Sequence, residues 1–373
     1  MFLGMAIDAT GCHPDSRRHF PGDPLDPEHP RRLAREAERG GLDFVTLDDS
    51  MALPEGSPAA LGRPDALTVL AGIAPLTSTI GLLATVTTTY CEPFHVSRAL
   101  ATLDHISRGR AGWRPRVAAT AAEAAHFGPE PLAGADELHA EQDEFTEVVI
   151  KLWDSWEDGA EIRDVATGRF LDRSRLRRVE HAGEHFRVQG PANVPRPPQG
   201  HPVLAVGFDP RAHRAPAPEA DLVLVEVADA REARARVGAH TRVIGELEVL
   251  FSGDHGVSDW SGPAEGAGRR RAGFAGTPGE LARLLGDLWE SGDVDGFHLR
   301  PAFLPTTLSR FTAEVVPVLR QRSRLRPYPY SYPYPYPETA LGPYPETTPH
   351  PSAETTLRAR LGLPASAPNV LSA

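Results

Sequence analysis

The chain alternates short apolar runs with longer stretches in which apolar residues recur every three or four positions. Short runs are typical of strands buried on both faces, and the longer pattern predicts helices that pack one side against a core. The predicted strands cover residues 2–8, 42–47, 79–88, 110–118, 202–208, 221–227, 242–251 and 294–300. The predicted helices cover residues 29–41, 63–78, 92–109, 135–156, 277–292 and 308–322.

Eight strands with helices between most of them are typical of a (β/α)8 TIM barrel, an α/β fold. We therefore predict such a barrel for residues 1–325. The alternative is a doubly wound open sheet, but no Gly-x-Gly-x-x-Gly follows the first strand to favour it. The strand at 110–118 is the least regular prediction because it contains Pro115. The helix at 277–292 begins with a Thr-Pro-Gly-Glu capping box.

Residues 326–354 differ in composition from the rest of the chain. They hold most of the tyrosines, which alternate with prolines, and proline at that spacing prevents helix and sheet alike. We predict a Tyr/Pro-rich disordered linker there, followed by a C-terminal tail of residues 355–373. A ligand for a proline-recognition domain is the alternative interpretation of the tract.

The overall charge narrows the classes of partner. The chain of 373 residues has a formal net charge of −11, which argues against a nucleic-acid or anionic-membrane surface, because such surfaces require a basic face. The two cysteines, Cys12 and Cys91, exclude a disulfide framework and favour a reducing compartment. The first residues lack the basic region of a signal peptide, and no apolar run approaches the roughly 18 residues of a membrane span. We expect a soluble, cytoplasmic protein.

In a TIM barrel the active site is built from the loops that follow the strands. Polar residues follow most of the predicted strands: Asp8, Thr10, Cys12, His13, Asp48, Asp49, Thr87, Thr88, Thr89, Trp113, Arg114, Arg116, Asp209, Arg211, Asp254, His255 and Arg300. The hydroxyls of the three threonines could hydrogen-bond a flat polar ring or a phosphate, or could cap their own turn. The chain has no zinc-ligand spacing, so we predict no metal site. It also has no nucleophile elbow and no phosphate-binding loop.

Several long phrases in the chain resemble those of the bacterial luciferase-like flavin-dependent monooxygenases. They are FLGMAIDATGCHP, LAREAERGGLDFVTLDDS, ATVTTTYCEPFHVSRALATLDHISRGRAGW, FRVQGPANVPRPPQGHPV and GTPGELARLLGDLWESGDVDGFHLRP, in the order expected for that family. The branch they resemble is that of nitrilotriacetate and dibenzothiophene-sulfone monooxygenases. The similarity covers most of residues 1–322, and TTLRARLGLP at 355–364 resembles the usual C-terminus of that branch.

The resemblance implies a protein that binds reduced FMN, supplied by a separate NAD(P)H-dependent flavin reductase. With O2, such a protein oxygenates a small organic substrate. The resemblance identifies neither that substrate nor the catalytic residues. It also implies a homodimer, for which the predicted helices at 29–39 and 63–78 are the candidate surfaces.

On this resemblance, four residues are expected near the flavin ring. Asp49 matches a flavin-contacting Asp of the family that follows the second strand. Thr87 and Thr88 fall where the third strand meets the ring system. Trp113 is a further candidate for contact with the flavin, with packing in the barrel wall as the alternative.

The cofactor site departs from the family pattern at several positions. Arg114 and Val117 stand where the family usually has Asn and Thr after the fourth strand. Ala135, His139 and Asp209 stand where it has the His, Tyr and Ser expected near the phosphate. Of these three, only His139 can still donate a hydrogen bond to a phosphate, and Asp209 would repel one.

The phosphate therefore needs other ligands. Arg114, Arg116 and Arg211 are the candidates, because arginine binds phosphate bidentately. Two alternatives to an FMN-dependent monooxygenase stay open at this stage. One is an oxidoreductase of the same fold that uses the deazaflavin F420, and the other is a non-catalytic flavin-binding or assembly barrel.

Overall fold

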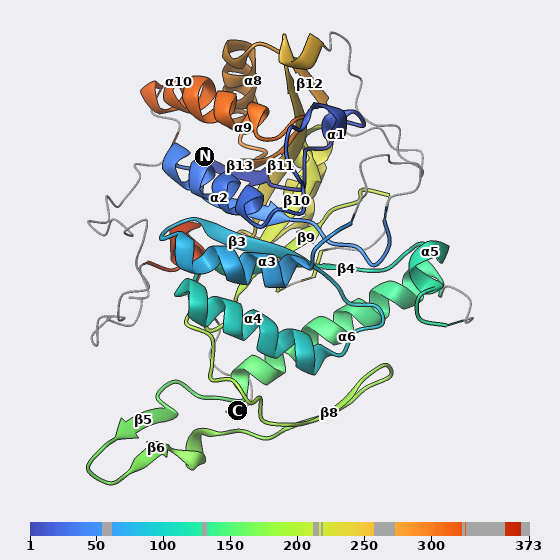
Figure 1. Ribbon diagram of the computed structural model, residues 1–373. Helices are drawn as coiled ribbons and strands as arrows, with labels where there is room; N and C mark the ends of the chain where they lie inside the picture. Colours follow the sequence, from blue (N-terminus) through green and yellow to red (C-terminus); the bar gives the residue numbers. More distant parts are fainter. Residues whose placement is uncertain are drawn as a thin grey trace.

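Eight parallel strands close into a barrel in the computed structural model of the chain (Figure 1). The structure describes residues 1–53, 62–128, 133–211, 216–217, 219–256, 273–322, 325 and 355–366. The barrel strands are β1 (Phe2–Ala6), β2 (Phe44–Leu47), β3 (Gly81–Thr87), β4 (Ala111–Arg116), β9 (Val203–Gly207), β10 (Leu222–Glu226), β11 (Arg242–Phe251) and β13 (Gly296–Pro301). Pairing of β1 with β13 and of β10 with β11 closes the ring, so the predicted TIM barrel is confirmed and an open sheet is excluded.

A further strand, β12 (Gly273–Gly276), lies beside the end of β11. Strand β11 is longer than the other barrel strands, and its last residues, Glu248–Phe251, pair with β12. Its earlier residues pair with β10 and β13. The extra strand therefore extends the wall of the barrel on one side of its mouth.

Helices cover the outside of the barrel. They are α1 (Ser16–His19), α2 (Glu28–Gly40), α3 (Ala66–Ile73), α4 (Pro93–Ser107), α5 (Ala121–Ala124), α6 (Ala135–Asp154), α7 (Ala230–Arg236), α8 (Pro278–Glu290), α9 (Thr306–Arg310) and α10 (Val316–Gln321). Short 3-10 turns are η1 (Ala74–Leu76), η2 (Arg173–Arg175), η3 (Val227–Asp229) and η4 (Asp254–Gly256), and η5 (Phe311–Val315) is a π-helical turn. Within the described residues, no helix is both long enough and apolar enough to span a membrane.

The helix ends follow from local chemistry. The helix predicted at 63–78 begins only at α3, because the carboxylate of Asp65 accepts a hydrogen bond from the amide of Thr68. It ends before η1, whose first turn contains Pro75. The capping box predicted for α8 is present, with Thr277 and Glu280 bonded reciprocally.

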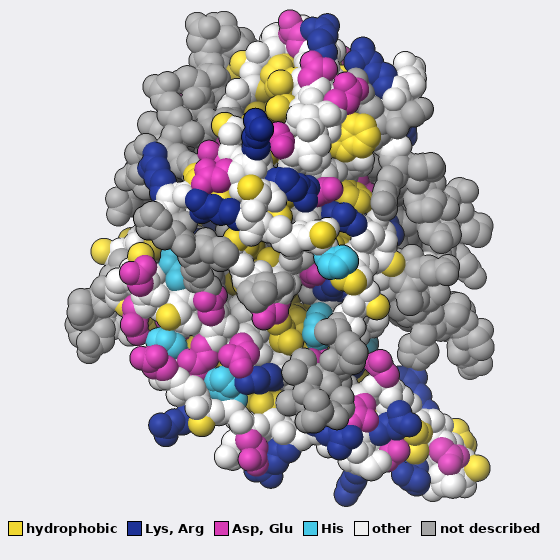
Figure 2. Space-filling model, turned by 180° about the vertical axis from the view of Figure 1, so that it is seen from behind, with side chains coloured by type: hydrophobic (Ala, Val, Ile, Leu, Met, Phe, Trp, Pro, Cys, Tyr) yellow, Lys and Arg dark blue, Asp and Glu magenta, His cyan; other side chains and the backbone are white. Residues whose placement is uncertain are grey.

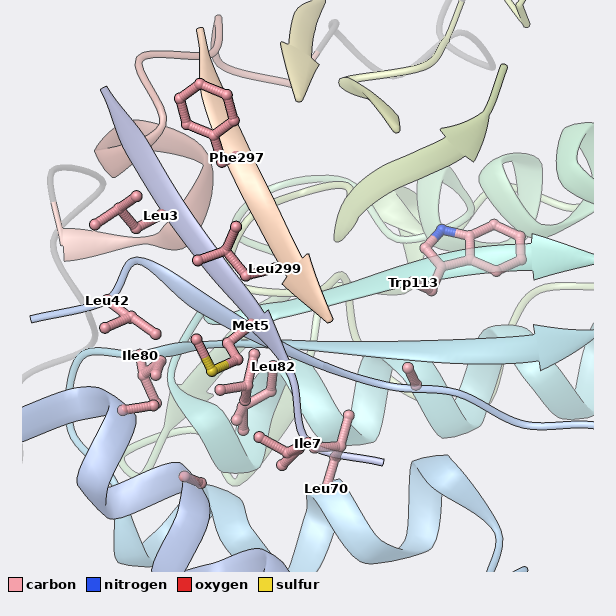
Figure 3. Packing of buried hydrophobic residues seen from close by; sticks show 14 of the residues in the cluster. Leu3, Met5, Ile7, Leu42, Leu70, Ile80, Leu82, Trp113, Phe297 and Leu299 are labelled. Carbon is pink, nitrogen blue, oxygen red and sulfur yellow. The ribbon is translucent and has the colours of Figure 1, made fainter. Parts of the chain in front are cut away.

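The larger apolar cluster forms a layer between the strands and the helices. Leu3 and Met5 of β1 are buried there with Leu82 of β3 and Leu70 of α3 (Figure 3). A second apolar cluster fills the inside of the barrel near the start of its strands and includes the ring of Phe44. The strands therefore bury both faces, which is why their sequences read as continuous apolar runs.

Two antiparallel hairpins between α6 and β9 were not predicted from the sequence. They are β5 (Glu161–Asp164) with β6 (Arg169–Leu171), and β7 (Val179–Ala182) with β8 (Arg187–Gly190). Figure 1 shows the first of them projecting away from the barrel, below α4 and α6. A small cluster that includes Trp156, Val179 and Val188 packs the second hairpin against the end of α6.

The segment of residues 355–366 packs against the barrel. It contains the short helix α11 (Leu357–Arg360) and is red in Figure 1, on the opposite side of the barrel from α5. Its three leucines, Leu357, Leu361 and Leu363, are buried with the residues at the start of the barrel strands. The linker predicted at 326–354 lies outside the described residues.

Candidate active site at the mouth of the barrel

A pocket of about 350 Å³ opens at the carboxyl ends of β4 and β9, beside α6. Active sites of TIM barrels are built at this end, and small-ligand sites have volumes of roughly 300–1,000 Å³. The charged and polar side chains of its described wall are Asp48, Thr85, Arg114, Arg116, His139, Gln142, Asp143, Thr146, Asp209 and Arg300. The apolar part of the wall includes Pro115, Val117, Leu204, Val206 and Phe208. A smaller cavity shares Asp48, Thr85, Arg114 and Arg300 with the pocket and adds Asp8, Thr46, Leu83, Ala205, Leu224 and His298.

Three arginines face this pocket, and they differ in how tightly they are held. Arg116 makes two hydrogen bonds to Glu123, with N–O distances of 2.6 and 3.2 Å. The guanidinium of Arg114 lies 3.9 Å from a carboxylate oxygen of Glu246, and that of Arg300 lies 3.8 Å from Glu248. Those two distances exceed hydrogen-bond length, so the donors of Arg114 are available to a ligand in the pocket.

Glu123 fixes Arg116 at the rim of the pocket. Besides Arg116, its carboxylate accepts hydrogen bonds from the hydroxyls of Ser50 and Thr120. Burial alone would raise the pKa of Glu123, but the hydrogen bonds from Arg116 and Ser50 lower it to about 2. The carboxylate is therefore ionised at neutral pH and joins the loops after β2 and β4.

A chain of buried hydrogen bonds crosses the barrel below Arg114. Nδ1 of His298 lies 3.0 Å from Glu246, and Nε2 lies 2.8 Å from the hydroxyl of Thr46. Burial works to raise the pKa of Glu246, but Arg114 and His298 lower it to about 2. An ionised Glu246 holds the proton on Nδ1, so in the neutral imidazole Nε2 accepts the hydroxyl proton of Thr46.

Two carboxylates, those of Asp8 and Asp48, lie beside this chain of hydrogen bonds. The backbone amide of Asp48 donates to the carboxylate of Asp8 at 2.6 Å. Burial, and then the neighbouring carboxylate of Asp48, raise the pKa of Asp8. The nearby guanidinium of Arg300 limits this rise. Within the described residues there is no group of three or more His, Cys, Asp or Glu side chains placed to hold a metal ion.

Of the residues predicted for the cofactor site, His139 lines the pocket from α6. Its Nδ1 lies 2.6 Å from the carbonyl oxygen of Ala135, one turn earlier in the helix. Arg211 is exposed and is not part of the described pocket wall, and its backbone amide donates to the carboxylate of Asp209 at 2.9 Å. The departures from the family pattern therefore gather at one place, because Arg114, His139 and Asp209 all face the same pocket.

The two predicted threonines lie at the end of β3 and are bonded to the neighbouring strand. The hydroxyl of Thr88 donates to the carbonyl oxygen of Arg116 at 3.2 Å. The hydroxyl of Thr87 accepts a weaker hydrogen bond from the guanidinium of Arg116 at 3.4 Å. Both residues are buried, so their hydroxyls here support the rim and the position of Arg116.

Asp49 and Trp113 lie outside the described wall of the pocket. The carboxylate of Asp49 accepts hydrogen bonds from the amides of Ser50 and Ala66, which ties the loop after β2 to the start of α3. Burial raises the pKa of Asp49. Trp113 is fully buried and packs edge-on against Trp153 of α6, because it occupies the outward face of β4 while Arg114 faces inward. Contact of Trp113 with a flavin stays a prediction.

Five polar residues inside the barrel were not predicted from the sequence. They are Thr46, Thr85, Glu246, Glu248 and His298. A signal for them exists, because Glu246 and Glu248 alternate with apolar residues in β11, as His298 and Arg300 do in β13. Alternate positions of a strand share a face, and in a barrel wall the polar face must be the inner one.

Comparison with known proteins agrees with this geometry. Residues 9–249 match the family described as luciferase-like monooxygenase. Nitrilotriacetate monooxygenase component A of Aminobacter aminovorans is 44% identical over 220 residues, covering 55% of this chain and 49% of that protein. The chain thus spans about half the length of that relative. Dibenzothiophene-sulfone monooxygenase of Rhodococcus erythropolis is 32% identical over 403 residues, covering 83% of this chain and 88% of that protein.

Solved structures share the fold at lower sequence identity. EDTA monooxygenase from Chelativorans sp. BNC1 superposes with a TM-score of 0.78 at 24% identity, covering 98% of both chains. An F420-dependent secondary alcohol dehydrogenase superposes with a TM-score of 0.60 at 15% identity, covering 86% of this chain and 99% of that one. The family match, the extended similarity to the sulfone monooxygenase and the barrel lead to one conclusion: the chain belongs to the luciferase-like monooxygenase family.

Proposed function

We propose that this protein is an FMN-dependent monooxygenase. It would use reduced FMN, delivered by an NAD(P)H-dependent flavin reductase, and O2 to oxidise a small organic substrate. The observation that carries the proposal is the pocket at the barrel mouth, in which the Arg114 guanidinium faces the cavity with its nearest carboxylate 3.9 Å away. Membership of the family supports the reaction class, and the pocket supports a bound anionic cofactor.

The residues of the pocket fit a flavin nucleotide. Its apolar wall, formed partly by Val206 and Phe208, suits a flat ring, and Gly207 between them leaves backbone exposed to a ligand. Arg114 and Arg116 provide planar donor pairs that match a phosphate. Asp209 opposes an anion at the same wall, so the arginines must outweigh its charge.

The chain's own residues would bind, orient and shield the cofactor. Bound reduced FMN supplies the electrons with which O2 is activated. Arg114 would hold the phosphate, while Glu123 keeps Arg116 in place at the rim. Val206 and Phe208 would keep water from the ring. Below the pocket, the carboxylate of Glu246 lies within hydrogen-bond distance of Nδ1 of His298 and keeps a proton on that nitrogen.

An anaerobic titration tests the proposal. Reduced FMN should bind saturably and change its absorbance, and with a flavin reductase and NADH the bound flavin should consume O2. Binding of F420 with no binding of FMN would support the alternative cofactor, for which the F420-dependent structural relative is the precedent. If neither flavin binds in either redox state, the barrel is a non-catalytic member of the family.

The assembly and the surface complete the proposal. We propose a homodimer formed through α2 and α3, and light scattering that gives the 40.3 kDa monomer at micromolar concentration would contradict it.

On the face shown in Figure 2, the described Lys and Arg side chains are interspersed with Asp and Glu, which fits an enzyme of small molecules better than a nucleic-acid binder.

A further inference from the structure

Residues 355–366 cover the end of the barrel opposite the pocket. We propose that this end is a peptide-binding site whose ligand is the chain's own segment of residues 355–366, and that docking of the segment orders the floor of the pocket. The segment contributes no strand to the described sheet, so it acts as a ligand of the barrel rather than as a continuation of the wall.

Glycines of the barrel form a cradle shaped to this segment. A Cβ atom added at Gly81 would lie 2.6 Å from a methyl carbon of Leu357, and one at Gly109 would lie 2.8 Å from Thr356. Real Cβ atoms essentially never approach other heavy atoms within 3.0 Å. The barrel therefore lacks side chains at the points where the segment makes its nearest approach.

Charged side chains and backbone groups of the barrel hydrogen-bond residues of the segment. The Arg358 guanidinium makes two hydrogen bonds to the carboxylate of Asp221, at 2.7 and 2.6 Å, and others to the carbonyl oxygen of His201. The backbone amide of Leu357 donates to the carbonyl oxygen of Gly109 at 2.8 Å. Arg358 and Asp221 are both largely buried, and a bidentate pair of this kind selects a position and an orientation.

The other half of the segment is held through its backbone. Arg242 of the barrel donates to the carbonyl oxygens of Leu361, at 3.1 Å, and Gly362, at 2.6 Å. Helix α11 has only 4 residues, and isolated helices shorter than about 12 residues are marginal in water. The conformation of the segment therefore depends on the barrel, as expected of a peptide that folds on binding.

The docked segment shares side chains with the pocket above it. Leu83, Ala205 and Leu224 belong to the apolar cluster that contains Leu357 and Leu361. The same three side chains line the cavity beneath the pocket. Removing the segment would expose their lower side to water, so any ligand that needs an ordered floor binds the docked state more tightly.

The test uses the full chain with a specific protease site inserted between Leu325 and Thr355. After cleavage, the released segment is expected to co-elute with the barrel on size exclusion at micromolar concentration. A fluorescein-labelled synthetic peptide of residues 353–366 should then exchange into the site and raise its anisotropy. Unlabelled native peptide should compete with the labelled one. The Arg358→Ala peptide should compete at least tenfold more weakly. The Ala365→Ser peptide, which is changed at an exposed position, should compete as well as the native peptide.

A barrel substitution checks the same contact from the other side. Gly81→Ala should weaken the labelled peptide at least tenfold, because the new methyl collides with Leu357. Gly279→Ala is the matched control, since a Cβ at Gly279 meets no atom within 4 Å. The docking inference is overturned if the cleaved segment leaves the barrel completely, or if the Arg358→Ala peptide competes as well as the native one.

Coupling between the docked segment and the pocket is tested by hydrogen exchange and by FMN affinity. Only the FMN measurement rests on the proposed function. Hydrogen exchange in β3, β9 and β10 should become faster when the cleaved segment is removed by dilution, and slow again when peptide is added back. Affinity for FMN should fall at least threefold and recover in the same way. Unchanged exchange overturns the coupling, whereas failure of FMN to bind even the intact chain counts against the proposed function alone.

Discussion

The two ends of the barrel hold their charges in different ways. At the end where the strands begin, Arg110 makes five hydrogen bonds, to Ser107, Ala74, Ile80 and two atoms of Thr77. At the mouth, the guanidinium groups of Arg114 and Arg300 lie 3.9 and 3.8 Å from their carboxylates. All three arginines point into the protein, but among the described residues only Arg110 has all its donors satisfied.

This difference separates stability from binding in one fold. A buried guanidinium with every donor satisfied holds the surrounding loops together, and its loss leaves carbonyl groups without donors. A guanidinium held only by a nearby charge keeps donors for a ligand, at some cost to stability. The division agrees with the general rule that the mouth of a TIM barrel carries function and the other end stability.

The largest effect is expected at the end where the strands begin. Arg110→Ala should lower the free energy of unfolding by about 3–5 kcal/mol, because it leaves several buried carbonyl oxygens without a donor. Urea denaturation measures the change. Arg322→Ala, at an exposed position, is the control and should change it by less than about 0.5 kcal/mol. Equal effects of the two substitutions would remove the proposed contrast between the ends.

A pH profile sharpens the same comparison. Asp104 is fully buried, and burial raises its pKa from 3.8 to about 6. Because the folded state binds this proton more tightly, the stabilising contribution is present below pH 4 and is lost as the pH rises to about 6. The loss amounts to about 3 kcal/mol for a rise of this size.

The substitution Asp104→Asn removes that titration. The free energy of unfolding of the variant, minus that of the wild type, should therefore rise by about 3 kcal/mol between pH 4 and 7. Urea denaturation at several pH values measures it. Asp136→Asn, at an exposed position of α6, should show no such trend, and a flat difference for Asp104→Asn would mean that the buried carboxyl is not the titrating group.

At the mouth, the expected effect is on binding rather than on stability. Arg114→Gln should weaken FMN by roughly 10- to 100-fold, about 1.4–2.8 kcal/mol, because a charged hydrogen-bond donor to the phosphate is lost. Its free energy of unfolding should fall less than that of Arg110→Ala, because Arg114 makes no hydrogen bond to Glu246 at 3.9 Å, although its charge helps to keep that buried carboxylate ionised. Anaerobic titration and urea denaturation of the same sample test both halves. A large loss of stability with unchanged FMN affinity would place Arg114 with the structural arginines.

The smallest effect concerns the acid in the pocket wall. Asp209→Ser should tighten FMN by about three- to tenfold, since it removes a negative charge that faces the bound phosphate. Asp209→Asn is a matched variant that removes the charge but keeps the size, and it should act in the same direction. Weaker binding in both variants would show that Asp209 does not face the phosphate.

Much of the fold could be predicted from local pattern. The eight strands appear at the predicted positions, and most of them lie in continuous apolar runs, because a strand covered on both faces admits few polar residues. The hairpins between α6 and β9 were missed, since β5 to β8 are short, largely exposed and rich in charge. Such strands carry no clear alternation, and each hairpin is defined by pairing rather than by composition.

The candidate site was predicted less completely. The family resemblance drew attention to Arg114, His139 and Asp209, and the structure brings these three to one pocket. The network of Glu246 and His298 was missed, because it joins strands that are 52 residues apart in the chain. A lone acid or histidine in an apolar strand gives no sign of its partner.

By itself, the sequence determined the order of strands and helices, the family and the positions at which the cofactor site departs from it. These depend on residue types and spacings along the chain. Only the tertiary structure decided which side of β4 carries Trp113 and which carries Arg114, and that residues 355–366 close the end of the barrel where the strands begin. The physical reason is that strand alternation defines two faces without saying which turns inward. Closure of the sheet and burial of apolar area among distant segments then make that choice.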